Sequence, residues 1–300
     1  MRASFVAAMA LLATLVLSAE ARATTSVCTW VTLGVCDFGP TYNHLSGTPL
    51  DTTSTLVFNC TTVGSSVTLG MGAGLQGTET ARVFNGSTDS YQIYTDSART
   101  NYFGTTAGHT VVISSPVLGN NTVTYYCRIP NGQVIHTGGH HDDNNTTLTF
   151  GSTTLTGTSH EYMTVNGTCS VTVGTQLAFG TYDPTGANLS SPLYGTATII
   201  VNCTSYLAWD LDLDQGLNPA GGNTNTHPLR QMASGAARLR YDLFRDAAHS
   251  IIWGYQALSD VSGTGTGADD TRTVYGSVLS GQTGTAAASY TDTVTITVSF

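Results

Sequence analysis

The sequence predicts an all-β protein made of two β-sandwiches in tandem, and three observations support this prediction. The first is composition, because Thr, Ser and Gly are abundant while only 10% of the residues are charged. Such a composition suits strands with small polar outer faces rather than helical bundles. The second is a series of short alternating or β-branched runs with Gly, Pro and Asn between them, such as 55–60, 122–129, 196–203 and 238–244. Many short antiparallel strands at this spacing are typical of a sandwich.

The third observation is a framework of residues that occurs twice. In the first copy Phe38 follows Cys28 by ten residues, Gly104 follows Asp96 by eight, and Gln133 follows Tyr126 by seven. In the second copy the same residue types recur at the same spacings, as Cys169 and Phe179, Asp246 and Gly254, and Tyr275 and Gln282. Three equal spacings in the same order indicate two related domains. We place them at residues 24–165 and 166–300, with the boundary near 164–168, where Val-Asn-Gly interrupts the pattern.

Residues 1–23 have the form of a secretory signal peptide. Arg2 gives a positive start, an apolar run follows, and Ala21-Arg22-Ala23 resembles a cleavage site. The chain contains no lysine and has a formal net charge of −9. This charge argues against nucleic acid and against anionic lipid as partners, since both need clustered basic residues. We therefore expect an exported protein.

Six cysteines in an exported chain favour disulfide bonds. The repeat aligns Cys28 and Cys60 with Cys169 and Cys203, the only pair available to the second copy. We therefore predict the bonds Cys28–Cys60 and Cys169–Cys203, which leaves Cys36–Cys127 for the first domain alone. A zinc site is the alternative, but the chain has no Cys-x-x-Cys spacing.

The run 293–300 is the clearest strand in the sequence. Val294, Ile296, Val298 and Phe300 share one face, with hydroxyl side chains on the other. Such an apolar strand at an edge leaves one side of its backbone unpaired unless another chain pairs with it. The alternative is that it pairs fully within its own domain. The first copy, in contrast, is followed by a further run at 152–163.

The second copy contains six short motifs in order between residues 169 and 300. They are LAFGTYDP at 177–184, VNC at 201–203, LRYDLF at 239–244, WG at 253–254, YG at 275–276 and YTDTVTI at 290–296. These motifs, in this order, resemble the spore coat protein U domain, and the first copy looks like a diverged relative. This family includes pilins of archaic chaperone–usher fimbriae as well as coat proteins of bacterial spores.

The resemblance implies an incomplete immunoglobulin-like sandwich in the second domain. Its open groove would be held by a periplasmic chaperone, delivered to an outer-membrane usher, and then filled by an N-terminal donor strand of the adjacent pilin. The family's terminal strand carries over to residues 291–300, so Val294, Ile296, Val298 and Phe300 are the expected chaperone and donor-strand edge.

Only residues 24–27 separate the cleavage site from Cys28, too few for a donor strand of about ten residues. We therefore expect a subunit that accepts a strand and caps the fibre. It would be a two-domain tip adhesin at the cell surface, exported through the periplasm, whose first domain binds a host or abiotic surface. Residues 152–163 would then be that domain's own closing strand. The alternative function is a structural spore or cell-surface coat protein that self-associates.

Apolar side chains in loops of the first domain are the candidate adhesive groups. Exposed apolar loop tips can bury against a surface, although the same side chains could instead cap the ends of the core. The candidates are Met71, Leu75, Val117, Leu118, Val134 and Ile135.

Metal and catalytic sites find weaker support. The segment 136–143 carries three His and two Asp in a predicted polar loop, which is either a metal site or an ordinary surface loop. Asp210, Asp212 and Asp214 imitate a calcium loop, but their alternation with apolar residues fits a strand with an acidic outer face. His160-Glu161 lacks the second His of zinc proteases, and Asp96 and Asp246 match as turn-capping residues. We expect no cofactor and no enzymatic activity.

Overall fold

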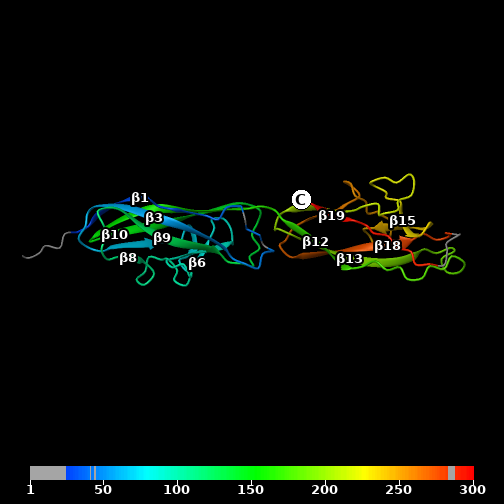
Figure 1. Ribbon diagram of the computed structural model, residues 1–300, viewed down its shortest axis with the longest axis horizontal. Coiled ribbons are helices and arrows are strands. Elements are labelled where there is room, and N and C mark those ends of the chain that lie inside the picture. Colours follow the sequence, from blue (N-terminus) through cyan, green and yellow to red (C-terminus); the bar gives the residue numbers. More distant parts are fainter. Residues whose placement is uncertain (1–24, 41, 44, 283–287) are drawn as a thin grey trace, which may run out of the picture.

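The computed structural model describes residues 25–300 except 41, 44 and 283–287, and this part of the chain is built of strands. The expected signal peptide, residues 1–23, lies outside the described residues. Within the described part, no helix has the length and apolarity needed to cross a membrane. Figure 1 shows two strand-rich bodies that lie end to end along the long axis. The all-β prediction is confirmed.

The first sandwich consists of a six-stranded and a five-stranded sheet, in the orders β1-β3-β9-β7-β6-β5 and β2-β11-β10-β4-β8. Alternate side chains of the long strands point between the sheets, such as Leu56 and Phe58 of β3 and Leu148 of β10, and are fully buried. The strands are β1 (Val27–Thr32), β2 (Val35–Asp37), β3 (Leu50–Thr62), β4 (Val67–Met71), β5 (Gln76–Thr78), β6 (Ala81–Val83), β7 (Ser90–Tyr94), β8 (Val111–Ile113), β9 (Gly119–Ile129), β10 (Gly138–Phe150) and β11 (Thr153–Val165).

The second sandwich consists of a five-stranded and a three-stranded sheet, in the orders β12-β13-β18-β16-β15 and β17-β14-β19. Trp209 and Leu211 of β14 and Ile199 of β13 lie in its core. The strands are β12 (Cys169–Thr175), β13 (Leu193–Cys203), β14 (Ala208–Leu213), β15 (Arg230–Ser234), β16 (Ala237–Phe244), β17 (Val261–Thr264), β18 (Asp269–Val278) and β19 (Ile296–Ser299).

The two sandwiches repeat one arrangement of strands. The order β12-β13-β18-β16-β15 repeats β1-β3-β9-β7-β6, and β17-β14-β19 repeats β8-β4-β10. In the first sandwich the second sheet continues past β10 through β11 to β2. Among the described residues, β19 has no strand on the corresponding side. Within the described residues the second sandwich therefore lacks a counterpart of β11, as the family resemblance implies.

The strand β11 closes the first sandwich. It pairs antiparallel with β10 from Thr153, opposite Phe150, to Val165, opposite Gly138. Its other edge pairs in parallel with the short strand β2. The expectation that the run 152–163 forms the domain's own closing strand is confirmed.

All three predicted disulfide bonds are present. Cys28–Cys60 joins β1 to β3, and Cys169–Cys203 joins the equivalent strands β12 and β13. Cys36–Cys127 links β2 to β9, and so connects the two sheets of the first sandwich. The two equivalent bonds lie at the same place in the repeat, which supports the alignment of the copies.

The junction between the sandwiches is held by contacts of residues 134–137. The backbone N–H of Thr137 donates to the carbonyl of Ser205 at 3.2 Å, and the rings of His136 and Tyr206 meet edge to face at 4.4 Å. Val134 packs against the backbone of Gly267.

Candidate strand-acceptor groove

The unpaired edge of the second sandwich lies along β19. One edge of β19 pairs with β14, from Ile296 opposite Leu213 to Ser299 opposite Asp210. Val294, Ile296 and Val298 are half-buried and pack against the core, while Phe300 is exposed. The residues predicted as a pairing edge therefore lie at the rim of the core, beside the side of the sheet where no further strand lies among the described residues.

A groove of about 510 Å³ runs beside this edge, between the two sheets. Ile296 and its strand partner Leu213 line the groove from one sheet, and Val173 and its strand partner Ile199 line it from the other. Leu177 and Val294 complete the lining. A second hollow of about 680 Å³ shares Leu177, Phe179, Met232 and Tyr290 with the first and extends to Leu239 and Val278. The two hollows therefore adjoin each other beside the unpaired edge.

The first sandwich shows what fills this place when the fold is complete. Asp142 of β10 accepts hydrogen bonds from Tyr91 Oη at 2.6 Å and from Leu75 N at 3.0 Å. Asp292 accepts the same two bonds, from Tyr241 Oη at 2.7 Å and from Leu217 N at 2.9 Å. Residues 142–150 therefore correspond to 292–300, and the place of the groove is the place of β11.

A buried arginine extends the match between the two cores. Arg82 Nη2 donates to the carbonyls of Met71 and Phe103, and Arg230 Nη2 donates to the carbonyls of Leu213 and Trp253. Burial lowers the pKa of both guanidinium groups, and that of Arg230 falls to about 10. Each arginine satisfies backbone acceptors that the strand ends leave unpaired inside the core.

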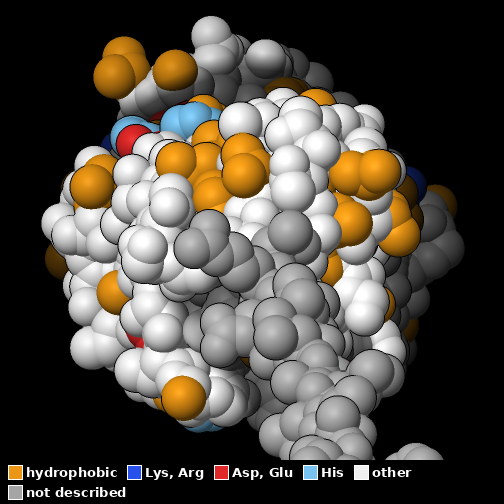
Figure 2. All heavy atoms as spheres, turned by 90° about the vertical axis from the view of Figure 1, so that its left-hand side faces the viewer, with side chains coloured by type: hydrophobic (Ala, Val, Ile, Leu, Met, Phe, Trp, Pro, Cys, Tyr) orange, Lys and Arg blue, Asp and Glu red, His pale blue; other side chains and the backbone are white. Residues whose placement is uncertain are grey.

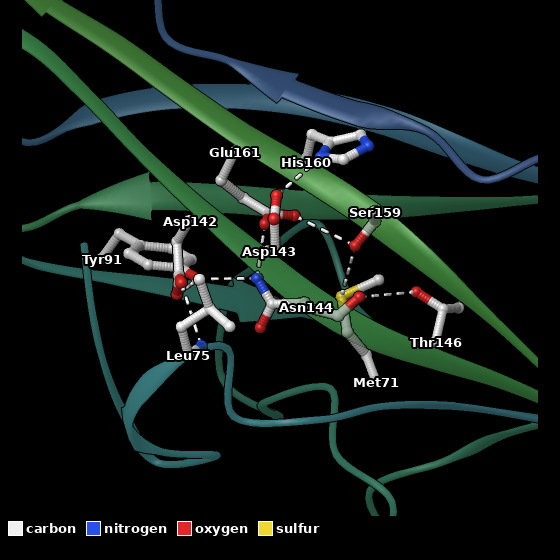
Figure 3. Close-up of polar contacts among 10 residues, drawn as sticks. All are labelled: Met71, Leu75, Tyr91, Asp142, Asp143, Asn144, Thr146, Ser159, His160 and Glu161. Carbon is white, nitrogen blue, oxygen red and sulfur yellow. Dashed lines mark hydrogen bonds and ion pairs between the residues drawn. The ribbon is translucent and has the colours of Figure 1, made fainter. Parts of the chain in front are cut away.

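The inward face of β11 is polar where it meets the middle of β10 (Figure 3). Asn144 Nδ2 donates to the carboxyl of Glu161, and also to Tyr91 Oη at 2.6 Å. Ser159 Oγ donates to the other oxygen of Glu161 at 3.2 Å. Burial raises the pKa of Glu161 to about 8, and the bonds from Asn144 and Ser159 oppose that rise. Glu161 is thus a buried acid whose two carboxyl oxygens accept hydrogen bonds from Asn144 and Ser159.

Sequence reasoning missed this role of Glu161. It was weighed only as part of a zinc-protease motif, together with His160. The sequence does contain an indication of this role. Glu161 and Met163 are two residues apart in the predicted closing strand, so their side chains lie on the same face, and the apolar Met163 places that face toward the core. The interactions of Arg82 and Arg230 depend on residues far apart in sequence and could not be read from a local pattern.

The predicted adhesive residues divide into four groups. Met71 and Ile135 are fully buried, so the expectation that they are exposed is wrong: both belong to the core of the first sandwich. Val134 lies at the junction of the sandwiches, against Gly267. Leu75 is exposed on the flank, where its backbone binds Asp142.

Val117 and Leu118 lie at the end of the first sandwich. They precede Gly119, which pairs with Cys60 beside the Cys28–Cys60 bond. This is the end that faces away from the second sandwich (Figure 1). Their exposed fractions are 58% and 65%, and Figure 2 shows hydrophobic side chains gathered on this end.

The residues considered as metal ligands, 136–143 and 210–214, lie mostly in strands. Residues 138–143 start β10 rather than forming a loop, and His160 Nδ1 lies 2.7 Å from Asp143 Oδ1. Across the described ranges, no three His, Cys, Asp or Glu side chains cluster in a way that could hold a metal ion. Residues 210–213 lie on β14, with Leu211 and Leu213 buried, so they form a strand as expected.

The turn-capping role of the two matched aspartates is confirmed. Asp96 accepts the backbone N–H groups of Thr100 and Asn101, and Asp246 accepts those of Ser250 and Ile251. The bond from Asn101 is the main reason that the pKa of Asp96 lies below its usual range.

Comparison with known proteins agrees with this geometry. The family model of the Spore Coat Protein U domain matches the chain twice, over residues 12–147 and 153–297. Protein U of Myxococcus xanthus is 36% identical over 154 residues, which are 49% of this chain and 86% of that protein. The family that the motifs of the second copy indicate is therefore confirmed, and it extends to the first copy.

A solved structure shares the fold over most of the chain. It belongs to the CsuC–CsuE chaperone–tip adhesion subunit pre-assembly complex, from archaic chaperone–usher Csu pili of Acinetobacter baumannii. The superposition has a TM-score of 0.53 and covers 91% of this chain and 100% of the other, at 17% identity. At that identity the likeness concerns the fold.

Proposed function

This chain belongs to the spore coat protein U domain family, and we propose that it is a non-enzymatic tip adhesin subunit of a chaperone–usher pilus. The observation that carries the proposal is the groove beside β19, which takes the place that β11 fills in the first sandwich. The second sandwich accepts a donor strand from the adjacent pilin, and the first sandwich binds a surface.

The strand would bind by adding to the edge of β19. Its backbone pairs with residues 291–300, and its alternate side chains fill the groove between Val294, Ile296 and Leu213. Each apolar side chain fully buried in this way contributes about 1.5–3 kcal/mol. Before assembly, a periplasmic chaperone covers the same edge and delivers the subunit to the outer-membrane usher.

The direction of the strand supports a position at the tip. In the first sandwich β11 runs antiparallel to β10. β19 runs toward the junction between the sandwiches, where the C-terminus lies (Figure 1). A donor strand with the direction of β11 therefore leaves the groove at the far end of the second sandwich. The rest of the pilus extends from there, and the first sandwich points away from it.

The free end of the first sandwich would make contact with the surface. Val117 and Leu118 project there from the connection between β8 and β9, and both are more than half exposed. Exposed apolar groups of this kind bury readily against a hydrophobic host or abiotic surface. We assign the adhesive role to these two residues and not to Met71 or Ile135.

The second candidate function is a self-associating coat protein. The family description and the relative from Myxococcus xanthus favour it. In that case the groove of one copy is filled by another copy of the same chain, and the purified protein forms homopolymers. A tip subunit instead needs a strand from a different subunit.

The test is co-expression of the chain with periplasmic chaperones of the same organism, followed by thermal unfolding of the purified complex. Synthetic peptides with the N-terminal sequences of that organism's pilins are added to one half of the sample. We expect a chaperone complex whose second sandwich gains stability when a peptide replaces the chaperone. A stable monomer that is indifferent to every peptide contradicts the proposal, and homopolymers favour the coat protein.

A further inference from the structure

The groove of the second sandwich differs chemically from the place that β11 fills in the first. Residues 142, 144 and 146 of β10 correspond to 292, 294 and 296. The aspartate is the same in both, but Asn144 and Thr146 are replaced by Val294 and Ile296. The first site offers the Asn144 amide to its strand, and Thr146 Oγ1 donates to the Asn144 carbonyl, whereas the second has only aliphatic side chains at these two positions.

The polar residues of β11 match the first site. Glu161 lies opposite Asp142 and Ser159 lies opposite Asn144 in the register of the two strands. The Asn144 amide donates to Glu161, and Ser159 donates to it from the neighbouring inward position. These two donors, together with the positive charge of Arg82, favour the buried carboxyl in its own sandwich.

The side-chain donors that line the second groove, Thr175, Gln176 and Thr198, do not stand at the position of Asn144. At the same register Glu161 would face Asp292, whose oxygens already accept from Tyr241 and Leu217. Val294 has no donor to replace the Asn144 amide. A buried glutamate faces an acid and loses its charge at neutral pH in either groove, so the difference between the two grooves is the Asn144 amide.

Three of the five N–H donors of Arg230 are already used. Its Nε and Nη2 donate to the carbonyls of Asp214, Leu213 and Trp253. Its Nη1 has no partner within the described part of the chain. The corresponding Nη1 of Arg82 points to Gln92 and to the carbonyl of Glu79, and not to Glu161.

We propose that Glu161 and Ser159 confine β11 to its own sandwich, because the groove beside β19 has Val294 at the position of the Asn144 amide. This inference rests on the proposed function, because it assumes that the groove accepts a strand. The two polar residues thereby prevent β11 of one copy from filling the groove of another. The chain does not polymerise through β11, and it stays available for a different subunit.

The register of β10 and β11 also shows where the later residues of a partner strand would lie in the second sandwich. Met163 lies opposite His140, which corresponds to Tyr290 of the second sandwich. The hollow lined by Tyr290, Phe179 and Leu239 is therefore the place for residues equivalent to Met163 and Val165. The partner strand carries large apolar side chains there.

The hairpin of the first sandwich provides the experiment. A second copy of residues 151–165 is appended to Phe300 of the full chain, so that its turn and strand can fold back on β19 in the register of β11. One version keeps the natural sequence. A second version, the apolar copy, carries Ser159→Val and Glu161→Leu in the appended segment only. A matched control carries Thr156→Leu and Thr158→Val, two outward positions of the same strand.

Thermal unfolding of the second sandwich is followed by the fluorescence of Trp209 and Trp253, both buried there. We expect the apolar copy to raise the unfolding temperature by about 10 °C over the natural copy, because two unpaired polar groups are removed. The control copy should behave as the natural one. In a chain with Val294→Asn, the natural copy should gain stability and the apolar copy should lose it.

Two results overturn the inference. The natural copy could stabilise the unsubstituted groove as well as the apolar copy does, or the outward control could stabilise it equally. Either result shows that the inward polar residues do not decide which strand binds. If no appended copy stabilises either groove, the groove does not accept a strand, and the proposed function fails together with the inference.

Discussion

Glu161 lies directly opposite Asp142 in the antiparallel pair of β10 and β11, and both side chains are fully buried. Two acids therefore face each other across the strand that completes the first sandwich. Tyr91 donates to Asp142, and Asn144 donates to Glu161 and to the Tyr91 hydroxyl. The closure of this sandwich depends on a polar network, whereas the groove of the second is lined mainly by apolar side chains.

This arrangement predicts a pH-dependent stability of the first sandwich. The pKa of Glu161 is raised to about 8 in the folded protein, mainly by burial, from 4.5. The folded state therefore binds more protons between these values, and stability falls as pH rises through this window, by at most about 1.4 kcal/mol per pH unit. Arg82, Asp142 and Tyr91 are the ionisable groups that face it.

Glu161→Gln should remove this pH dependence, because an amide keeps the size and hydrogen-bonding capacity without titrating. Denaturant unfolding between pH 4.5 and 8.5 measures the effect. We expect the variant to be more stable than the natural chain at pH 8, with a smaller difference at pH 4.5. Two parallel curves would show that another group sets the pH dependence.

The two matched tyrosines should respond differently to loss of the hydroxyl. Tyr91→Phe removes one hydrogen bond from Asp142 and one from Asn144, both fully buried, at a cost of about 2–4 kcal/mol. Tyr241→Phe removes one bond to Asp292, which is only half-buried, and should cost about 1 kcal/mol. Unfolding of each variant, followed by tryptophan fluorescence, gives the two values. Equal losses would mean that the network around Asn144 adds nothing.

Much of this fold follows from local pattern and from the repeat. The alternation of residues 293–300 predicts an edge strand with an apolar face, and the aligned cysteines predict which pairs join. Both predictions hold because they depend on the period of a strand and on the equivalence of two copies. The turn-capping role of Asp96 and Asp246 follows in the same way, from their matched positions.

The positions of single side chains depend on contacts that the sequence does not show. Met71 follows glycine in a loop-like context, yet it ends β4 and is covered by the core. Ile135 follows a Pro-Asn-Gly turn, yet it packs between the sheets near the junction. Glu161 looks like a surface residue by type, and only the register of β10 and β11 reveals its partners.

A charge placed in the groove should abolish chaperone binding. Ile296→Lys puts an ammonium group among apolar side chains, where an unpaired charge is strongly unfavourable. The matched control is Thr297→Lys on the outer face of the same strand, opposite Asp212. Co-purification with the chaperone should be lost in the first variant and kept in the second. Loss in both would indicate that β19 itself, and not its inward face, had been disrupted.

The free end of the first sandwich should determine adhesion to hydrophobic surfaces. Val117→Ser and Leu118→Ser together remove two exposed apolar side chains, each contributing about 1.5–3 kcal/mol when fully covered. Binding of purified protein to polystyrene should fall at least about tenfold, with little change on hydrophilic glass. Leu258→Ser is the control, since Leu258 is 90% exposed but lies on the second sandwich. An equal loss with Leu258→Ser would mean that general surface hydrophobicity, and not this end of the molecule, drives attachment.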